Sequence, residues 1–401
     1  MTQTPPFGPM TRAIHAGESH ETEPRASSPS IHMSSSFVSD SVSGFSAHDM
    51  TDDSPYCYTR WGNPTVKMLE DKIAAMQGTE ACLCTASGMA AASAIFLTFL
   101  SAGDHVIVSD ISYAGVAEFV RDTLPRMGVE VSTVDMSDTA NVAAAMRPNT
   151  KLVHSESPAN PIMRLCDLAA ISKIAHQGGA LHSTDATFAS PIGIDAMALG
   201  IDLVMHSITK YVCGHGDAVG GAVAASAGLV KRMRVEAAIH HGGILSPFNA
   251  WLIARGAATL PLRMRAHEAG TRAIAKWLEA HPAVTSVCWP GLKSHSQHEL
   301  AKRQMRNFSG MLTFQVGDKT AGERIANTMI EKLRVIHYAV SLGHHRSLVF
   351  WLDSAALIDT SFKLTGAAAE SYRALAGDGV FRLSVGLEDP KDLIADLDRV
   401  L

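Results

Sequence analysis

The stretch that decides the fold is IDLVMHSITKY, residues 201–211. Its first five residues form an apolar run of strand length, and a lysine, Lys210, follows soon after the run ends. Similar runs alternate with helical stretches along residues 60–255, at 104–110, 129–134, 151–155, 179–184 and 220–225. Strands that alternate with helices pair in parallel and form a sheet that helices cover on both faces. We therefore predict an α/β fold with a mostly parallel sheet.

The helical stretches and the chain ends suggest three parts. One helix is predicted to start after Ser87-Gly88, another to cover 116–127, and a third to cover 168–175 with Asp167 as its N-cap. Beyond Arg255 the pattern changes to a long helix at 257–281, strands at 310–315 and 380–385, and a final helix at 391–401. The first residues are rich in Ser, Thr, Pro and His without sustained periodicity. We predict an N-terminal arm (1–60), a large domain (61–256) and a small C-terminal α+β domain (257–401).

Composition excludes several classes of function. The net charge is −5 and no block of like charges occurs, so we expect neither a nucleic-acid nor a membrane-surface partner. The six cysteines form no C-x-x-C pair, which favours reduced thiols over disulfides or a zinc site. The first thirty residues lack the apolar stretch of about 7 to 15 residues that a signal peptide needs. The longest apolar run, 89–100, is shorter than the roughly 20 residues of a membrane span. These features predict a cytoplasmic protein.

Polar residues that follow the predicted strands are the candidates for chemistry, because ligands of such sheets bind beyond the carboxyl ends of strands. Lys210 is placed where a lysine with a lowered pKa can form a Schiff base with an aldehyde. Ser207 and Thr209, two residues apart, can point their hydroxyls at one phosphate beside it. The alternative is a lysine that extends from a sheet edge to solvent beside two ordinary hydroxyls.

Three further strand ends or turns point to the same crevice. Asp185 ends an apolar strand and suits a pyridinium nitrogen, although an aspartate there is more often a cap or turn residue. The turn Ser87-Gly88-Met89 opens a helix with free backbone N–H groups, which any helix start would offer to an anion. Tyr113 follows another strand and can stack on a flat cofactor, or simply pack.

An ordered set of motifs extends these observations through nearly the whole chain. It comprises Tyr58-Thr59-Arg60, Gly62-Asn63-Pro64-Thr65, Ser87-Gly88-Met89, Glu156-Ser157-Pro158-Ala159-Asn160-Pro161, Asp185-Ala186-Thr187, His206-Ser207-Ile208-Thr209-Lys210-Tyr211, Ser246-Pro247, Arg255-Gly256, Ser341-Leu342-Gly343 and Phe381-Arg382-Leu383-Ser384-Val385-Gly386. The set resembles the Cys/Met-metabolism (trans-sulfuration) family of pyridoxal 5'-phosphate (PLP) enzymes, which includes methionine γ-lyase, cystathionine synthases and lyases, and homoserine-ester sulfhydrylases. The resemblance implies the fold-type I architecture, like that of aspartate aminotransferase, with a seven-stranded type of sheet.

The resemblance also implies a role for each matching residue. Lys210 would carry the cofactor as a Schiff base and shuttle protons, Asp185 would pair with the pyridine nitrogen, and Tyr113 would stack on the ring and act as an acid. The phosphate would be held by a set of residues that includes two from the arm of the neighbouring subunit: Gly88, Met89, Ser207, Thr209, Tyr58 and Arg60. Thr187 would join the cofactor site. Asn160, Ser341 and Arg382 would bind the substrate carboxylate. No metal is expected, and a homotetramer built as a dimer of dimers with shared sites is implied.

The implied reaction is the elimination of the γ-substituent of a sulfur- or homoserine-derived amino acid, such as methionine, a homoserine ester or ether, or canavanine. The alternative is γ-replacement, as in an O-acetyl- or O-succinylhomoserine sulfhydrylase. A catalytically silent PLP-binding protein is the third interpretation, but loss of Lys210, Tyr113 or Arg382 would mark it, and all three are present.

Three stretches depart from the family pattern. Methionine γ-lyases usually carry a cysteine just after the stacking Tyr-Gly pair, where this chain reads Tyr113-Ala114-Gly115-Val116. After Ser341-Leu342-Gly343 the family commonly continues with a glutamate that meets the distal amino group of cystathionine, whereas this chain reads His344-His345-Arg346-Ser347-Leu348. A cation at Arg346 argues against cystathionine as the main substrate. The stretch 349–353 lacks the usual His-Pro run and is either a neutral loop or a reshaped pocket. His344-His345 lacks the spaced carboxylates or thiols of a metal site. For the cationic end of canavanine, Asp52 and Asp53 are the candidate partners.

Overall fold

The computed structural model of the chain describes residues 7–18, 26–40, 46–47 and 54–401. The chain forms two compact units, each built from two separated stretches. Unit 1 comprises Met1–Leu100 and Asp202–Pro261, and unit 2 comprises Ser101–Ile201 and Leu262–Leu401. The division into an arm (1–60), a large domain (61–256) and a small domain (257–401) stays a prediction.

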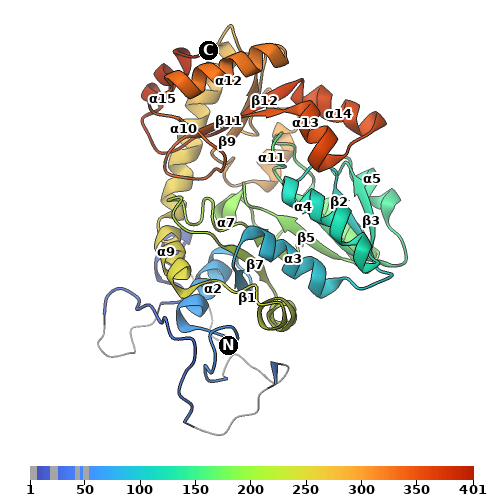
Figure 1. Cartoon of the computed structure of the whole chain (residues 1–401), viewed down its shortest axis with the longest axis vertical. Coiled ribbons are helices and arrows are strands. Elements are labelled where there is room, and N and C mark those ends of the chain that lie inside the picture. Colours follow the sequence, from blue (N-terminus) through green and yellow to red (C-terminus); the bar gives the residue numbers. More distant parts are fainter. Residues whose placement is uncertain (1–6, 19–25, 41–45, 48–53) are drawn as a thin grey trace. The chain divides into compact units, whose positions relative to one another are not determined.

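The described residues of unit 1 form three strands in the order β1-β7-β6, of which β1 and β7 are labelled in Figure 1. Strand β7 (Gly221–Ala225) pairs antiparallel with both β1 (Ala81–Thr85) and β6 (Leu203–His206). The predicted parallel pairing therefore does not extend to β7, because turns rather than a crossover helix connect it to β6. Strand β1 is absent from the predicted strands. The helices of unit 1 are α1 (Pro9–His15), α2 (Pro64–Gln77), α3 (Gly88–Phe99), α8 (Ala227–Met233), η4 (Arg234–His240) and α9 (Pro247–Ala257).

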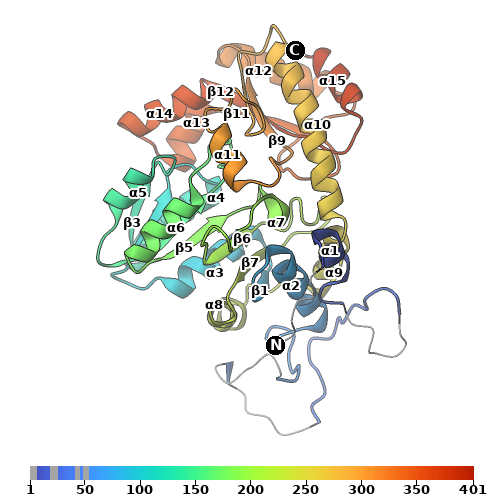
Figure 2. The same ribbon diagram turned by 180° about the vertical axis from the view of Figure 1, so that it is seen from behind.

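Four strands of unit 2 pair in parallel, in the order β5-β4-β2-β3. They are β2 (His105–Ser109), β3 (Glu130–Val134), β4 (Thr150–Glu156) and β5 (Leu181–Asp185). Helix α4 (Ala114–Glu118) lies in front of this sheet in Figure 1, whereas α6 (Leu168–Gln177) lies in front of it in Figure 2, where the view is turned by 180°. Helices thus cover both faces, and the predicted parallel α/β arrangement is confirmed for this part. The remaining helices here are η2 (Phe119–Thr123), η3 (Pro125–Met127), α5 (Thr139–Ala145) and α7 (Ser190–Gly193).

A second sheet of unit 2 has five strands in the order β10-β11-β12-β9-β8. They are β8 (Ser286–Cys288), β9 (Met311–Gln315), β10 (His337–Tyr338), β11 (Leu348–Asp353) and β12 (Gly379–Ser384). Its core is apolar, and the rings of Phe314 and Phe381 stack there with centroids 5.1 Å apart. The helices are α10 (Leu260–Ala280), α11 (His298–Gln304), α12 (Lys319–Lys332), α13 (Ser354–Leu357), η5 (Ile358–Phe362), α14 (Gly366–Ala376) and α15 (Pro390–Asp398). The predicted α+β character of this region is confirmed.

Part of the predicted arm forms the helix α1. A buried lysine of α2 binds the last turn of this helix. The Nζ atom of Lys72 donates to the carbonyl oxygens of Ala13 (3.0 Å) and Ile14 (2.6 Å), and it pairs with Glu18 Oε1 at 3.1 Å. Burial lowers the pKa of Lys72, and the charge of Glu18 opposes that shift. A cation at the last carbonyls of a helix also interacts favourably with the helix dipole.

Three kinds of feature are absent among the described residues: a membrane-spanning helix, a group of metal ligands and a disulfide. None of their helices is both long and apolar enough to cross a bilayer. Within the described ranges no three His, Cys, Asp or Glu side chains form a group that could hold a metal ion. All six cysteines are free thiols.

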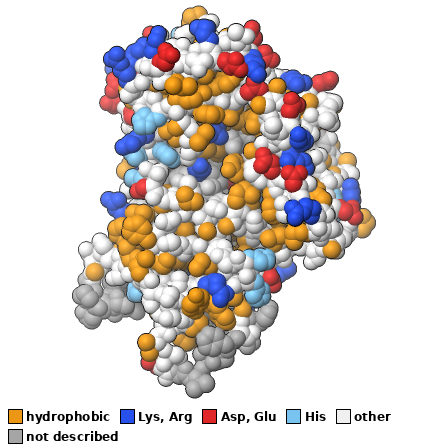
Figure 3. Space-filling model, viewed as in Figure 1, with side chains coloured by type: hydrophobic (Ala, Val, Ile, Leu, Met, Phe, Trp, Pro, Cys, Tyr) orange, Lys and Arg blue, Asp and Glu red, His pale blue; other side chains and the backbone are white. Residues whose placement is uncertain are grey.

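Hydrophobic side chains gather on the surface over α9 (Figure 3), where Phe248 is half exposed.

Candidate active site

Lys210 lies in a turn that hydrogen bonds fix just beyond the carboxyl end of β6. Its backbone N–H donates to the Ser207 carbonyl at 3.1 Å, and its own carbonyl accepts the N–H of Gly214 at 2.8 Å. The hydroxyl of Thr209 donates to the Gly220 carbonyl at 3.1 Å and accepts the Gly220 N–H at 3.0 Å. The turn is therefore held at the start of β7 as well, and the half-buried Lys210 has a defined position in unit 1.

The first turn of α3 forms an anion site in the same unit. Ser87 caps this helix, because its Oγ accepts the N–H of Ala90 and its carbonyl accepts the N–H of Ala91, both at 3.1 Å. The N–H groups of Gly88 and Met89 precede the first intrahelical bond and can bind an anion. A Cβ atom at Gly88 would lie 2.8 Å from Ser207 Cβ, so only glycine lets this serine approach the turn. The predicted phosphate-binding residues Gly88, Met89 and Ser207 therefore lie close together.

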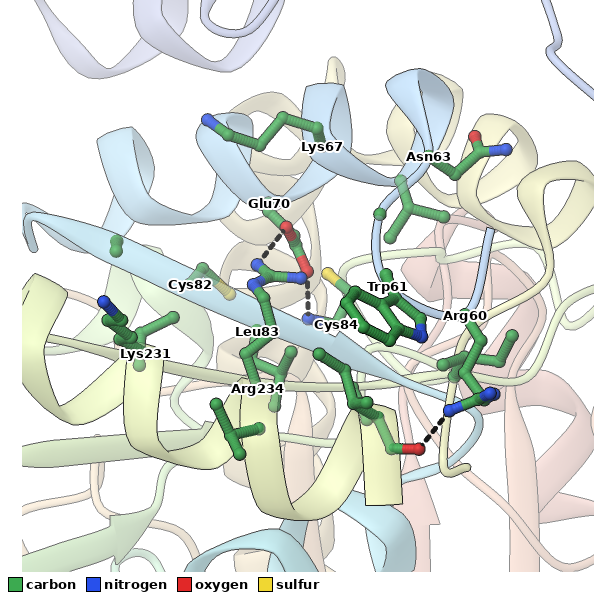
Figure 4. Close-up of a pocket in the computed structure, with 18 of the residues that line it drawn as sticks. Arg60, Trp61, Asn63, Lys67, Glu70, Cys82, Leu83, Cys84, Lys231 and Arg234 are labelled. Carbon is green, nitrogen blue, oxygen red and sulfur yellow. Dashed lines mark hydrogen bonds and ion pairs between the residues drawn. The ribbon is translucent and has the colours of Figure 1, made fainter. Parts of the chain in front are cut away.

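Arg60 lies on the wall of a cavity of about 440 Å³ in unit 1 (Figure 4). Its Nη1 donates to the Ile239 carbonyl at the end of η4, and its guanidinium lies over the Tyr58 ring at 5.5 Å from the centroid. Across the cavity, Glu70 pairs with Arg234 at 2.7 Å and accepts the Cys84 N–H at 2.9 Å. Arg60 and Tyr58 are thus adjacent, as their predicted shared role requires.

Asp185 and Tyr113 belong to unit 2. Asp185 is the last residue of β5 and is buried, and its Oδ1 accepts the Thr187 N–H at 2.8 Å. Burial raises the pKa of Asp185, while hydrogen bonds from Thr187 lower it. A cation placed against this carboxyl would reverse the shift, which is what a pyridinium nitrogen supplies. Tyr113 precedes α4 and is 47% exposed, so its side chain is accessible to a ligand.

Three residues predicted to bind the substrate carboxylate meet in unit 2. Arg382 on β12 donates from Nη1 to Asn160 Oδ1 at 2.9 Å and from Nη2 to the Ser341 carbonyl at 3.3 Å. These contacts orient the guanidinium, whose planar fork matches a carboxylate. Ser341 has a φ of +90°, a left-handed conformation that is costly for a residue other than glycine. Such strain at a cluster of this kind is typical of binding sites.

The structure adds two residues that the sequence did not assign to the site. Glu156 accepts the N–H groups of Tyr113 and Asn160 with its two carboxylate oxygens. His344 Nε2 lies 3.3 Å from Ser341 Oγ. The motif around Glu156 is visible in the sequence, but its partners are backbone groups, which no residue pattern reveals. His344 stands in the stretch that departs from the family pattern, and that departure was the available signal.

Each unit by itself contains groups of the kinds that PLP requires. Unit 1 contains the amine of Lys210, and the backbone N–H groups of Gly88 and Met89 beside Ser207 could bind a phosphate. Unit 2 contains the buried carboxyl of Asp185 and the partly exposed Tyr113. Asp52 and Asp53, named above for a cationic substrate end, lie outside the described residues.

Comparisons with known proteins find similar sequences and a similar structure over most of the chain. A sequence model of the family described as Cys/Met metabolism PLP-dependent enzyme matches residues 10–401. The chain is 41% identical to a canavanine γ-lyase of Rhizobium leguminosarum bv. trifolii, with 89% of this chain and 87% of that protein covered. It is 38% identical to an L-methionine γ-lyase of Treponema denticola, with 98% and 97% covered. The crystal structure of cystathionine γ-lyase from Lactobacillus plantarum, complexed with L-serine, is 34% identical, covers 98% of each chain and has a TM-score of 0.87.

These comparisons confirm the predicted fold-type I architecture, the PLP cofactor, the amino-acid substrate and enzymatic γ-lyase chemistry. The chain belongs to the Cys/Met-metabolism family of PLP-dependent enzymes.

Proposed function

We propose that this enzyme eliminates the γ-substituent of canavanine, in which an oxygen joins the guanidine group to the γ-carbon. One observation carries this choice over methionine: the stretch Tyr113-Ala114-Gly115-Val116 lacks the cysteine usual in methionine γ-lyases. The 41% identity to a canavanine γ-lyase supports the same choice. Methionine is the second candidate, because its lyase from Treponema denticola matches over nearly the full chain.

The residues of the chain would divide the work as follows. Arg382, with Asn160 and Ser341, binds the α-carboxylate of the substrate and fixes the amino acid at one end. The Lys210 amine takes the proton from Cα and then moves a proton at Cβ. Bound PLP supplies an electron sink for the negative charge that develops at these carbons.

Two further side chains complete the proposed reaction. Asp185 stays ionised opposite the pyridine nitrogen and favours its protonated form. The Tyr113 hydroxyl donates a proton to the γ-oxygen as the Cγ–O bond breaks, so that canavanine would release hydroxyguanidine. Thr187 orients Asp185 through its backbone N–H. In a γ-replacement enzyme the same groups would serve, and an incoming thiol would end the reaction.

The test is product release from the purified, PLP-loaded enzyme with canavanine, methionine, cystathionine, O-acetylhomoserine and O-succinylhomoserine, each with and without sulfide. We expect hydroxyguanidine release without sulfide, at a kcat/KM at least tenfold above that for release of 2-oxobutanoate from methionine. A higher kcat/KM for methionine or cystathionine would reject canavanine as the main substrate. Homocysteine formed from a homoserine ester, only when sulfide is present, would identify a sulfhydrylase.

We also propose that the enzyme assembles as a homotetramer, a dimer of dimers in which Tyr58 and Arg60 complete the phosphate site of a neighbouring subunit. The exposed Tyr58 ring and the hydrophobic surface over α9 support this arrangement. We expect light scattering to give the mass of four chains at the concentration of the assay. An active species with the mass of one chain would reject the shared site.

We infer a cytoplasmic location as well. The six free thiols support it, because cysteines of secreted proteins usually form disulfides.

A further inference from the structure

Glu156 occupies a position that connects two parts of the candidate active site. It is the last residue of β4 and is 6% exposed. Its Oε2 accepts the backbone N–H of Tyr113 at 2.6 Å, and its Oε1 accepts the backbone N–H of Asn160 at 2.7 Å. Tyr113 stands just before α4, and Asn160 lies in the loop that follows β4. One carboxylate therefore bridges two segments that are 47 residues apart in the sequence.

Both partners of Glu156 carry side chains of the proposed site. Asn160 accepts a hydrogen bond from Arg382 at 2.9 Å, so the position of the Asn160 backbone affects the guanidinium that would bind the substrate carboxylate. Tyr113 supplies the proposed stacking ring and acid. We propose that Glu156 is a positioning residue, which fixes the Tyr113 ring relative to the carboxylate-binding group of Asn160 and Arg382. This inference rests on the roles given to those residues under the proposed function.

The bridge needs a carboxylate rather than an amide. A glutamine of the same length has one acceptor oxygen, and its NH2 group would face the second backbone N–H. One of the two N–H groups would then lose its partner in a buried place, which is costly. That segment would shift until it found another acceptor.

The surroundings of Glu156 raise its pKa overall, although hydrogen bonds and one nearby cation oppose that shift. Glu156 and Asp185 are paired in register at the ends of β4 and β5. Burial, and then the charge of Asp185, raises the pKa of Glu156, whereas the two backbone hydrogen bonds and the charge of Arg382 lower it. The same groups that Glu156 positions thus stabilise its ionised form.

The principal test compares Glu156→Gln with Asp396→Asn in the PLP-loaded enzyme. Asp396 is a matched control, because it is 1% exposed, lies in unit 2, and accepts the N–H groups of Arg334, Val335 and Ile336. For Glu156→Gln we expect kcat/KM to fall on the order of ten- to a hundredfold, with both a higher KM and a lower kcat. For Asp396→Asn we expect a loss of stability at unchanged KM. An unchanged KM in Glu156→Gln, or an equal change in both variants, would overturn the proposal.

A double-mutant cycle separates positioning from general damage. If Glu156 acts through Asn160, then Glu156→Gln in an Asn160→Ala background should raise KM less than about threefold further, because the two changes remove one coupled unit. Fully multiplicative effects on KM would contradict this. Should Glu156→Gln fail to fold, Glu156→Asp retains both acceptors with a shorter reach and decides the matter: a raised KM supports the proposal, and a wild-type KM rejects it.

Arg382→Ala makes failure of the inference distinguishable from failure of the proposed function. If Arg382→Ala leaves KM unchanged, the substrate carboxylate binds elsewhere and the assigned site is wrong. If Arg382→Ala raises KM and Glu156→Gln does not, the site stands and only the role of Glu156 is rejected.

Discussion

Replacing Lys210 with alanine is expected to reduce turnover of the best substrate to background. The amine is the group that would attach PLP and also move the Cα and Cβ protons, and loss of a proton-transfer group alone costs about 10² to 10⁴ in rate. The fold should persist, because the Lys210 N–H donates to the Ser207 carbonyl and the Lys210 carbonyl accepts the Gly214 N–H, and both bonds hold the turn whatever the side chain. Product release and the visible absorbance of bound PLP are the measurements.

Lys231→Ala is the control for this prediction. Lys231 is an exposed lysine of α8 in the same unit, and it belongs to no proposed step. Its variant should retain wild-type turnover and absorbance. If Lys210→Ala kept more than about one hundredth of the wild-type rate, Lys210 would be removed from the mechanism.

Replacing Arg164 with methionine should lower the free energy of unfolding by about 3–5 kcal/mol, as when one partner of a buried ion pair is lost. Arg164 is 7% exposed, and it contacts Asp110 through Nη2 and Asp135 through Nη1, the latter at 3.0 Å. Its carbonyl also accepts the Ala159 N–H at 2.8 Å, next to Asn160. Urea unfolding of the two proteins measures the difference. Arg147→Met is the matched control, because its pair with Glu130 is half exposed and should contribute at most about 1 kcal/mol.

The effect of Arg164→Met should also depend on pH. Burial raises the pKa of Asp110, and Arg164 lowers it, so the variant leaves the rise unopposed. A carboxyl whose pKa is raised in the folded state contributes stability that is fully present below its unfolded value of about 3.9 and is lost as pH rises through the folded value. The variant should therefore differ from the wild type more at pH 8 than at pH 4. A difference that does not change with pH would exclude the unpaired Asp110 as its cause.

Much of the fold was predictable because its strands carry a strong signal. The runs at 104–110, 129–134 and 151–155 correspond to β2, β3 and β4, which lie between helices. The predicted N-cap Asp167 accepts the Ala170 N–H at 3.1 Å. Strand β1 was not predicted, because its sequence, Ala81-Cys82-Leu83-Cys84-Thr85, has few of the β-branched and aromatic residues typical of strands.

The candidate site was likewise predictable in part. Lys210, Asp185 and Arg382 were named by residue type and motif. The structure places Asp185 at the end of β5, Arg382 within β12 and Lys210 in the turn that follows β6. Glu156 was not predicted, because its proposed role depends on two backbone N–H groups. One of them, that of Tyr113, lies near Glu156 only because β2 pairs with β4. The φ of Ser341 is likewise a property of the folded loop.

The interleaved origin of the two units sets an order for their completion during synthesis. Unit 1 lacks β6 and β7 until the ribosome has passed residue 225, although its first 100 residues are made much earlier. In unit 2, Arg382 follows its partner Asn160 by 222 residues. At a synthesis rate of about 5–20 residues per second, Arg382 is therefore made roughly 10 to 45 s after Asn160. A nascent chain stopped anywhere before β12 would lack the carboxylate-binding group, however well its earlier segments had folded.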